Sequence, residues 1–206
     1  MANTTRKPRP TIGVSRYTFF KVVEETADSI TYGEAYSLPG TVEIVPTDAG
    51  GSDVFDADNG AYEVTTYLEK IGHDITNADI TPEVDAMWRG LEKQNGVLTV
   101  GAVTETPYFA VAWEILKSDG SKRYVKYYKG KYNFASNTGG KTKPSSGAPE
   151  KQTAKANYTA AQRESDGAYY SYIDEADIPE NVTKEEFEAQ WFSDASYHPG
   201  AVEENA

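Results

Sequence analysis

The sequence contains no cysteine and only two histidines, His73 and His198. The absence of thiols excludes disulfides, cysteine nucleophiles and thiolate metal ligands, so packing or partner subunits must stabilise the fold. A serine hydrolase would have to use one of the two histidines, and neither lies in the sequence context of a nucleophile elbow. We therefore expect a protein that is not an enzyme, with no catalytic residue, no cofactor and no metal ion.

Long hydrophobic runs are also missing. No stretch of about 18 apolar residues occurs, as a membrane-spanning helix would need, and no apolar segment follows the N-terminal MANTTRKPRP, as a secretion signal would require. These absences predict a chain that neither spans a membrane nor is secreted. Hydrophobic residues still make up 38% of the 206 residues and fall in organised runs, which predicts one folded domain.

The net charge of −12 is distributed unevenly along the chain. Residues 117–155 carry ten Lys or Arg against two acids, whereas residues 174–206 carry ten acids against one lysine. Opposite charges on neighbouring copies of the chain could attract each other, although a solvated surface with an incidental dipole explains the pattern equally well.

Most of the chain has the pattern of β-structure. Runs rich in β-branched and aromatic residues predict strands within residues 12–24 and 30–46, with a turn at Pro39-Gly40. Residues 61–69 alternate between apolar and polar side chains, so this strand should have one buried and one exposed face. The expected buried face consists of Tyr62, Val64, Thr66 and Leu68.

A hairpin is predicted in the middle of the chain. The apolar run 108–116 is followed by the turn Ser118-Asp119-Gly120 and by a second strand-like run, residues 123–134. Its first strand is apolar on both faces, so it should be central in the fold or covered by a neighbouring subunit. Further along, NYTAAQ and GAYYSYID look like a closing pair of strands.

Two helices are expected. Thr81 and Pro82 suit a helix start, and an apolar stripe follows at helical spacing until Asn95-Gly96, which predicts a helix over about 82–94 that flanks the sheet. Thr183 and Glu186 form a capping box, which predicts a short C-terminal helix that docks through its aromatic residues, Phe187 and Trp191.

The remaining segments are expected to be loops and ends. Residues 48–60 and 135–157 are predicted as long loops, and residues 1–11 and 198–206 as a flexible arm and an acidic tail around a single domain over 12–197. The first loop contains a cluster with the residue types of a calcium loop: Asp53, Asp56, Asp58, Asn59 and Gly60. Its glycine comes one position too early, which favours a turn rich in Asp and Asn.

At this point the order of features resembles the major tail protein family of siphophages. The pieces that carry the resemblance are GVSRYTFFKV, LPGTVEI, FDADNGAYE, IGHDITNADITPE before the helix around Trp88, YFAVAWEI with RYVKYYKGKYNF, the Lys-rich loop and the terminal FEAQWF. They span roughly residues 12 to 197. The resemblance implies a mainly β, sandwich-like or barrel-like tail-tube fold with one flanking helix and a short C-terminal helix.

The same resemblance implies a structural virion protein made in the host cytoplasm. Subunits of this family form hexameric rings that stack into a hollow tail tube, through which DNA passes at ejection. Partners would be further copies of the chain, a tape-measure protein, and the tail terminator and tip proteins. Proposed assembly contacts lie in the two long loops, at Val54, Phe55, Asp56, Asp58, Lys141, Lys143, Lys151 and Lys155.

Two other classes remain as alternatives. Fifteen tyrosines suit a carbohydrate-binding β-sandwich module, because aromatic rings stack on sugars, although tyrosine at alternate strand positions is more often sheet surface or interface. An adhesin or decoration protein of a virion would share the β content. The acidic balance speaks against a nucleic-acid reader, which needs a positive face.

Overall fold

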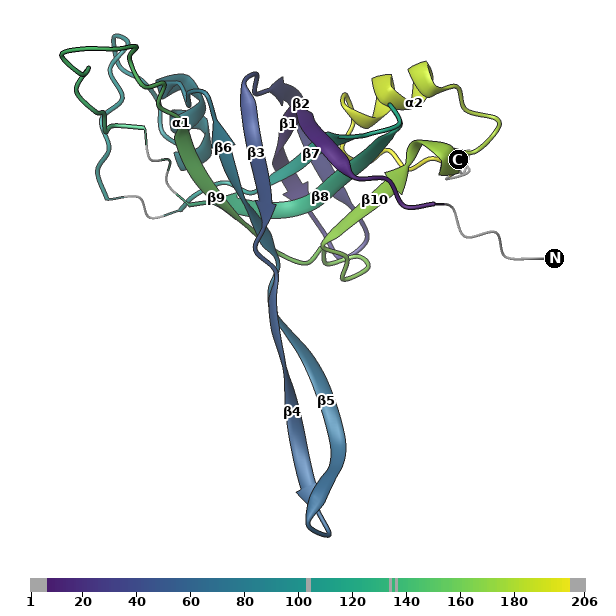
Figure 1. The fold of residues 1–206 in the computed structure, drawn as a ribbon. Coiled ribbons are helices and arrows are strands. Elements are labelled where there is room, and N and C mark those ends of the chain that lie inside the picture. Colours follow the sequence, from purple (N-terminus) through teal and green to yellow (C-terminus); the bar gives the residue numbers. More distant parts are fainter. Residues whose placement is uncertain (1–6, 103–104, 134, 136, 201–206) are drawn as a thin grey trace.

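The computed structural model describes residues 7–102, 105–133, 135 and 137–200. Figure 1 shows a β-rich body from which one long hairpin extends, with a helix on either side of the body. The strands are β1 (Thr11–Glu25), β2 (Ile30–Ser37), β3 (Thr41–Pro46), β4 (Ala49–Ala57), β5 (Gly60–Lys70), β6 (Gly72–Asn77), β7 (Phe109–Lys117), β8 (Lys122–Tyr132), β9 (Ala154–Ala160) and β10 (Tyr170–Asp174). The helices are α1 (Pro82–Arg89), α2 (Lys184–Trp191) and a short 3-10 helix, Glu175–Asp177.

The strands of the body form one antiparallel sheet. Its order is β2-β1-β7-β8-β9-β6-β3, and β10 pairs with the N-terminal part of β8. The strand β7 lies between β1 and β8, and its first six residues are buried, as the doubly apolar run predicted. Gly120, with φ of 84°, lies in the turn between β7 and β8, so the central hairpin is confirmed. The mainly β fold with two helices is confirmed as well.

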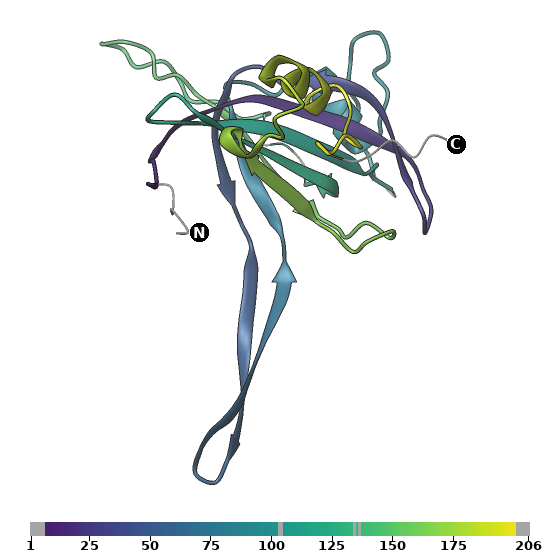
Figure 2. The same cartoon turned by 90° about the vertical axis from the view of Figure 1, so that its right-hand side faces the viewer.

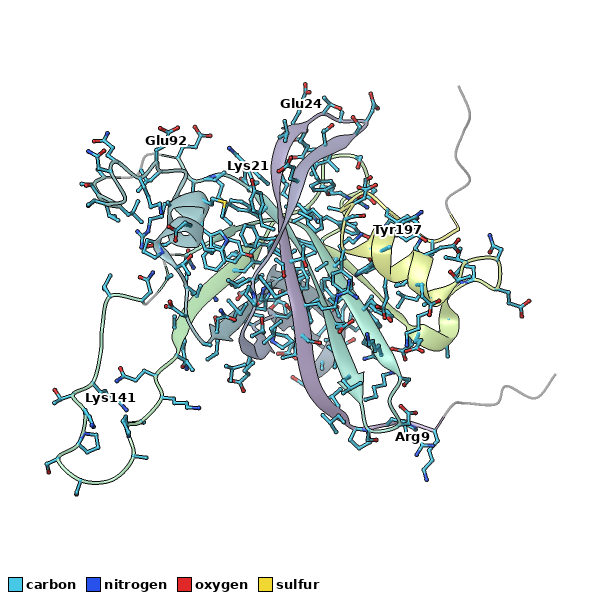
Figure 3. All side chains as sticks on the ribbon, turned by 90° about the horizontal axis from the view of Figure 1, so that it is seen from above. Arg9, Lys21, Glu24, Glu92, Lys141 and Tyr197 are labelled. Atoms are coloured by element: carbon cyan, nitrogen blue, oxygen red, sulfur yellow. The ribbon has the colours of Figure 1, made fainter. Side chains whose placement is uncertain are left out.

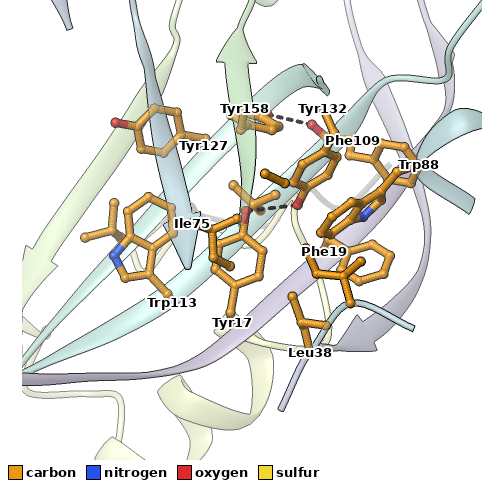
Figure 4. Close-up of a cluster of buried hydrophobic side chains, with 14 of the residues drawn as sticks. Tyr17, Phe19, Leu38, Ile75, Trp88, Phe109, Trp113, Tyr127, Tyr132 and Tyr158 are labelled. Atoms are coloured by element: carbon orange, nitrogen blue, oxygen red, sulfur yellow. Dashed lines mark hydrogen bonds between the residues drawn. The ribbon is translucent and has the colours of Figure 1, made fainter. Parts of the chain in front are cut away.

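Aromatic side chains fill the main core, which Figure 4 shows in close-up. Trp88 of α1 stacks on Tyr132 of β8 with ring centres 3.9 Å apart, so the helix docks on the sheet through this ring. The hydroxyl of Tyr17 lies 2.9 Å from that of Tyr132 and 2.8 Å from Nε2 of His73, so these buried polar atoms satisfy one another. Burial lowers the pKa of His73 to about 3, which keeps the ring neutral in the core.

The helix α1 is shorter than the sequence predicted. It ends at Gly90, which adopts the left-handed conformation with φ of 69°, and the amides of Gly90 and Leu91 bond back to the carbonyls of Met87 and Ala86. This glycine stop closes the helix before the expected end at Asn95-Gly96. That pair instead forms a small turn between Gln94 and Val97, whose backbones bond to each other.

The helix α2 begins at the predicted capping box. The side chain of Thr183 accepts from the amide of Glu186, and the carboxylate of Glu186 accepts from the amide of Thr183 at 3.1 Å. Phe187 and Trp191 are buried in a second cluster, on the sheet face opposite the main core. The predicted short helix that docks by two aromatic residues is therefore confirmed.

Several expected boundaries are corrected. The strands β9 and β10 do not pair with each other, because each pairs with a different part of β8. The long loop ends at residue 153, since β9 begins at Ala154. The small side chains of Ala154 and Ala156 are buried against the core, with exposed Lys155 between them. The expected flexible N-terminal segment, residues 1–11, is shorter too, because Thr11 already belongs to β1. Residues 1–6, 134 and 201–206 lie outside the described residues.

Candidate assembly surfaces

The hairpin of β4 and β5, which we call the arm, extends away from the body in both views of Figures 1 and 2. The prediction of a loop over 48–60 was wrong, because residues 49–57 form β4 and pair along their whole length with β5. The sequence pattern did not predict this strand, because its glycine and aspartate residues have low strand propensity. The pair Asp58-Asn59 makes the two-residue turn at the tip, with φ of 52° and 65°, so the interpretation of a turn there is confirmed.

The arm has apolar side chains that nothing in the described chain covers. Val54 lies directly opposite Val64, on the same face as Leu68. Phe55 is 62% exposed and Tyr62 is 72% exposed, and their rings meet edge to face. The prediction of one buried face for residues 61–69 was therefore wrong within the single chain, because the arm extends beyond the body and, among the described residues, no element packs on either of its faces.

Most charged residues of the arm are acidic. Asp53, Asp56 and Asp58 lie towards the tip and are exposed, and Glu63 lies opposite Phe55 on the other strand. No three His, Asp or Glu side chains of the described residues come together in a way that could hold a metal ion. The tip is therefore an acidic surface beside an apolar one, which suits contact with a basic and apolar partner.

An apolar groove lies where the arm leaves the body, and sequence reasoning missed it. Its volume is about 190 Å³, and Trp113 and Ile44 lie among its walls. Tyr170 stacks on Tyr127 with ring centres 4.8 Å apart, and Tyr172, 60% exposed, continues the row. The alternation of Tyr170 and Tyr172 in β10 was the one sequence signal, but only the pairing of β10 with β8 shows that both rings border a groove.

The Lys-rich loop, residues 135–153, projects from the body in Figure 3, where Lys141 is labelled. Lys141 pairs with Glu150 at 3.1 Å, and its amide donates to the side chain of Gln152 at 2.7 Å, so the base of the loop is closed. Lys143 and Lys151 are exposed. Lys155 does not belong to the loop, because it lies in β9. Within the described residues, the lysines of the loop and the acids of the arm therefore lie on different parts of the subunit (Figure 1).

Free strand edges of the body sheet offer a third surface. Within the described residues, β2 and β3 stand at the two ends of the strand order and β10 pairs only with β8, so each of the three has one edge without a strand partner. Unpaired edges are templates for strands of other chains, and two different edges on one subunit allow a head-to-tail ring.

No helix of the described residues is long and apolar enough to cross a membrane. A comparison of the sequence with protein-family models finds no match. A comparison with curated proteins finds none either.

Proposed function

We propose that this chain is a self-assembling structural subunit, and that the particular structure it builds is the tail tube of a siphophage. The observation that carries the proposal is the arm: a hairpin with exposed Val54, Phe55 and Tyr62 that no element of the described residues covers. Large exposed apolar surfaces mark interaction sites. An arm of this length is costly for a monomer and useful for a subunit that reaches a neighbouring copy.

Other features support the tube over a single pairwise contact. The free edges of β2 and β10 lie on different strands of one sheet, so pairing one with the other would join unlike surfaces, which is the kind of contact that builds closed rings. The acidic arm and the exposed Lys143 and Lys151 carry opposite charges on separate parts of the subunit. Rings would stack through such contacts, and DNA would pass through the lumen, as the resemblance to major tail proteins implies.

The arm provides the test. Phe55→Ser removes an exposed ring and should leave the monomer folded, because Phe55 has no contact with either buried cluster. We expect rings or tubes of the parent protein in negative-stain microscopy and a strong loss of them in the variant. Thr65→Ser, also exposed on the arm, is the matched control and should assemble normally.

Two results would count against the proposal. A Phe55→Ser variant that assembles like the parent would show that the arm is not a contact. Dispersed monomers of the parent that bind glycans would instead favour a sugar-binding module, for which exposed Tyr170 and Tyr172 beside the groove are the supporting observation.

A further inference from the structure

Lys126, in β8, is fully buried and points at the chain that follows α2. Its Nζ donates to the backbone oxygens of Asp194, at 2.9 Å, and Tyr197, at 3.2 Å. The same atom lies 4.2 Å from the ring centre of Trp191. We call residues 193–200, which these contacts fix to the sheet, the C-terminal clasp. A buried lysine held by two neutral carbonyl groups can change protonation state without losing both hydrogen bonds, because a neutral amine still has two N–H groups.

A second basic side chain closes the same clasp. Nε2 of His198 shares a hydrogen bond with the hydroxyl of Tyr128, at 2.5 Å. The guanidinium of Arg163, from the turn between β9 and β10, lies 3.7 Å from the centre of the Tyr128 ring. Three bases, Lys126, Arg163 and His198, therefore meet at the clasp.

Two acids face these bases. Asp166 is bound to Arg163 by a bidentate pair, and Asp194 faces Lys126 electrostatically while its side chain accepts from Ser196. Asp166 already compensates the charge of Arg163. If Lys126 and His198 are both protonated, only Asp194 is left to compensate their two positive charges. Protonation of both Lys126 and His198 should therefore strain the closed clasp.

The clasp covers an apolar face. Ala195 is fully buried against the second core cluster, beside Trp191 and Phe192, which pack over Phe20 and Tyr124 of the sheet. Figure 3 places the labelled Tyr197 beside α2 on this side of the body. Opening of the clasp would expose Ala195 to solvent and leave α2 attached through Phe187.

We propose that the C-terminal clasp is a proton-operated latch, closed at alkaline pH and opened progressively as protons bind Lys126 and His198. The inference concerns the isolated subunit and does not depend on the kind of assembly that the subunit forms.

The direction follows from the two bases. Burial lowers the pKa of Lys126 to about 7 in the closed state, helped by Arg163 and opposed by Asp194, whereas an exposed lysine has its usual value of 10.5. Burial also lowers the pKa of His198, helped by Lys126 and Arg163 and opposed by Asp166. Opening therefore takes up protons, so the clasp gains stability as pH rises and loses it as pH falls.

The expected size can be stated for Lys126. Between its open and closed pKa values, the opening equilibrium should increase up to about tenfold for each pH unit lowered, which amounts to roughly 50-fold from pH 9 to pH 7. Below pH 7 the contribution of Lys126 levels off, and His198 adds a smaller increase.

A thiol probe measures the opening, because the chain has no cysteine of its own. In Ala195→Cys the thiol is buried when the clasp is closed, and in Ser193→Cys it is exposed in either state. The ratio of their maleimide labelling rates cancels the pH dependence of thiol reactivity. We expect labelling of Cys at position 195, relative to position 193, to rise by about 50-fold from pH 9 to pH 7.

Variants identify the titrating group. Lys126→Met and Lys126→Arg should both flatten the response between pH 9 and pH 7, since methionine carries no proton and arginine keeps its own. Lys131→Met, on the same strand but beside Tyr108, is the control and should keep the parent slope. His198→Gln should remove only the part below pH 7.

The outcome that overturns the proposal is a labelling ratio independent of pH, or a Lys126→Met or Lys126→Arg variant that folds and keeps the parent slope. If the cysteine at position 195 itself disturbs the packing, amide hydrogen exchange of the parent replaces it. The amide of Asp194 ties the clasp to α2 by its bond to the carbonyl of Gln190, and the protection of this amide, corrected for the intrinsic rate, should fall over the same pH range.

Discussion

Gly130 of β8 lies beneath the ring of Tyr158, with no room for a side chain. A Cβ at this position would lie 2.3 Å from Cζ of Tyr158 and 2.5 Å from the carbonyl oxygen of Thr159. Because overpacking of a core costs about 1–3 kcal/mol, Gly130→Ala should lower the free energy of unfolding by that amount, seen as a lower urea midpoint at unchanged m-value. Gly139→Ala, where a Cβ meets nothing within 4 Å, is the control, and an equal midpoint for both variants would refute the prediction.

Single residues also show where sequence reasoning stops. Glycine in the middle of a β-rich run gives no sign of whether it serves a turn, as Gly120 does, or the close approach of a ring, as Gly130 does. The sequence indicates for His73 only a candidate catalytic group, yet it is a core residue that bonds to Tyr17. The network of Tyr17, His73 and Tyr132 joins β1, β6 and β8, and such distant partners cannot be paired from sequence alone.

Among the elements, α2 is held by an ion cluster as well as by its aromatic rings. Glu188 accepts from Tyr124 at 2.7 Å, from Lys122 at 2.9 Å and from Arg16 at 2.7 Å. Arg16 has φ of 56° at an irregularity in β1, and its guanidinium also lies over the ring of Phe192. The helix is therefore fixed by one carboxylate that receives three donors from the sheet.

Glu188→Gln should destabilise the protein by roughly 1.5–3 kcal/mol at pH 7, the range for hydrogen bonds to charged groups. Burial raises the pKa of Glu188, but the bonds from Tyr124 and Lys122 outweigh burial and keep the pKa below its usual 4.5. The stabilisation is present above that value and is lost as pH falls through the lower folded pKa. Denaturant titrations should thus show the difference shrinking in acid, whereas exposed Glu185→Gln should change little at any pH.

The elements themselves were predicted unevenly. Capping chemistry located the start of α2, and the doubly apolar run located β7, because both signals are local. The strand β4 was missed, because its residues are stabilised mainly by pairing with β5 and not by their own propensity. Likewise, the position of β10 depends on its pairing with β8, whose residues lie far from it in sequence.

At the scale of the whole molecule, the subunit keeps its opposite charges apart. The arm extends from one side of the body in Figure 1, whereas the Lys-rich loop projects from another part of it. Lys141 is already paired with Glu150 inside the loop, so the lysines left for contacts between copies are Lys143 and Lys151, with Lys155 at the start of β9. The predicted contact of these lysines with acids of another ring stays a prediction, now with one lysine fewer.

The last prediction concerns that loop. Replacing residues 139–151 with a few glycines and serines removes Lys141, Lys143 and Lys151 but leaves the sheet intact, since β9 begins at Ala154. Exposed ion pairs contribute only about 0.2–1 kcal/mol each, yet repetition around a closed ring adds them up. We expect the variant to form rings that stack poorly. The tubes of the parent protein should shorten at high salt, whereas the residual assembly of the variant should not respond to salt.

Particle length by microscopy and sedimentation at low and high salt measures both effects. A double variant, Lys143→Gln with Lys151→Gln, keeps the loop at full length. It therefore distinguishes the effect of the lysine charges from the effect of removing the loop. It should shorten the tubes if the lysines act as charges, because glutamine retains hydrogen-bonding capacity but attracts no carboxylate of the next ring. Tubes of normal length and unchanged salt response in both variants would mean that the loop is a solvated insertion, and that stacking rests on the arm alone.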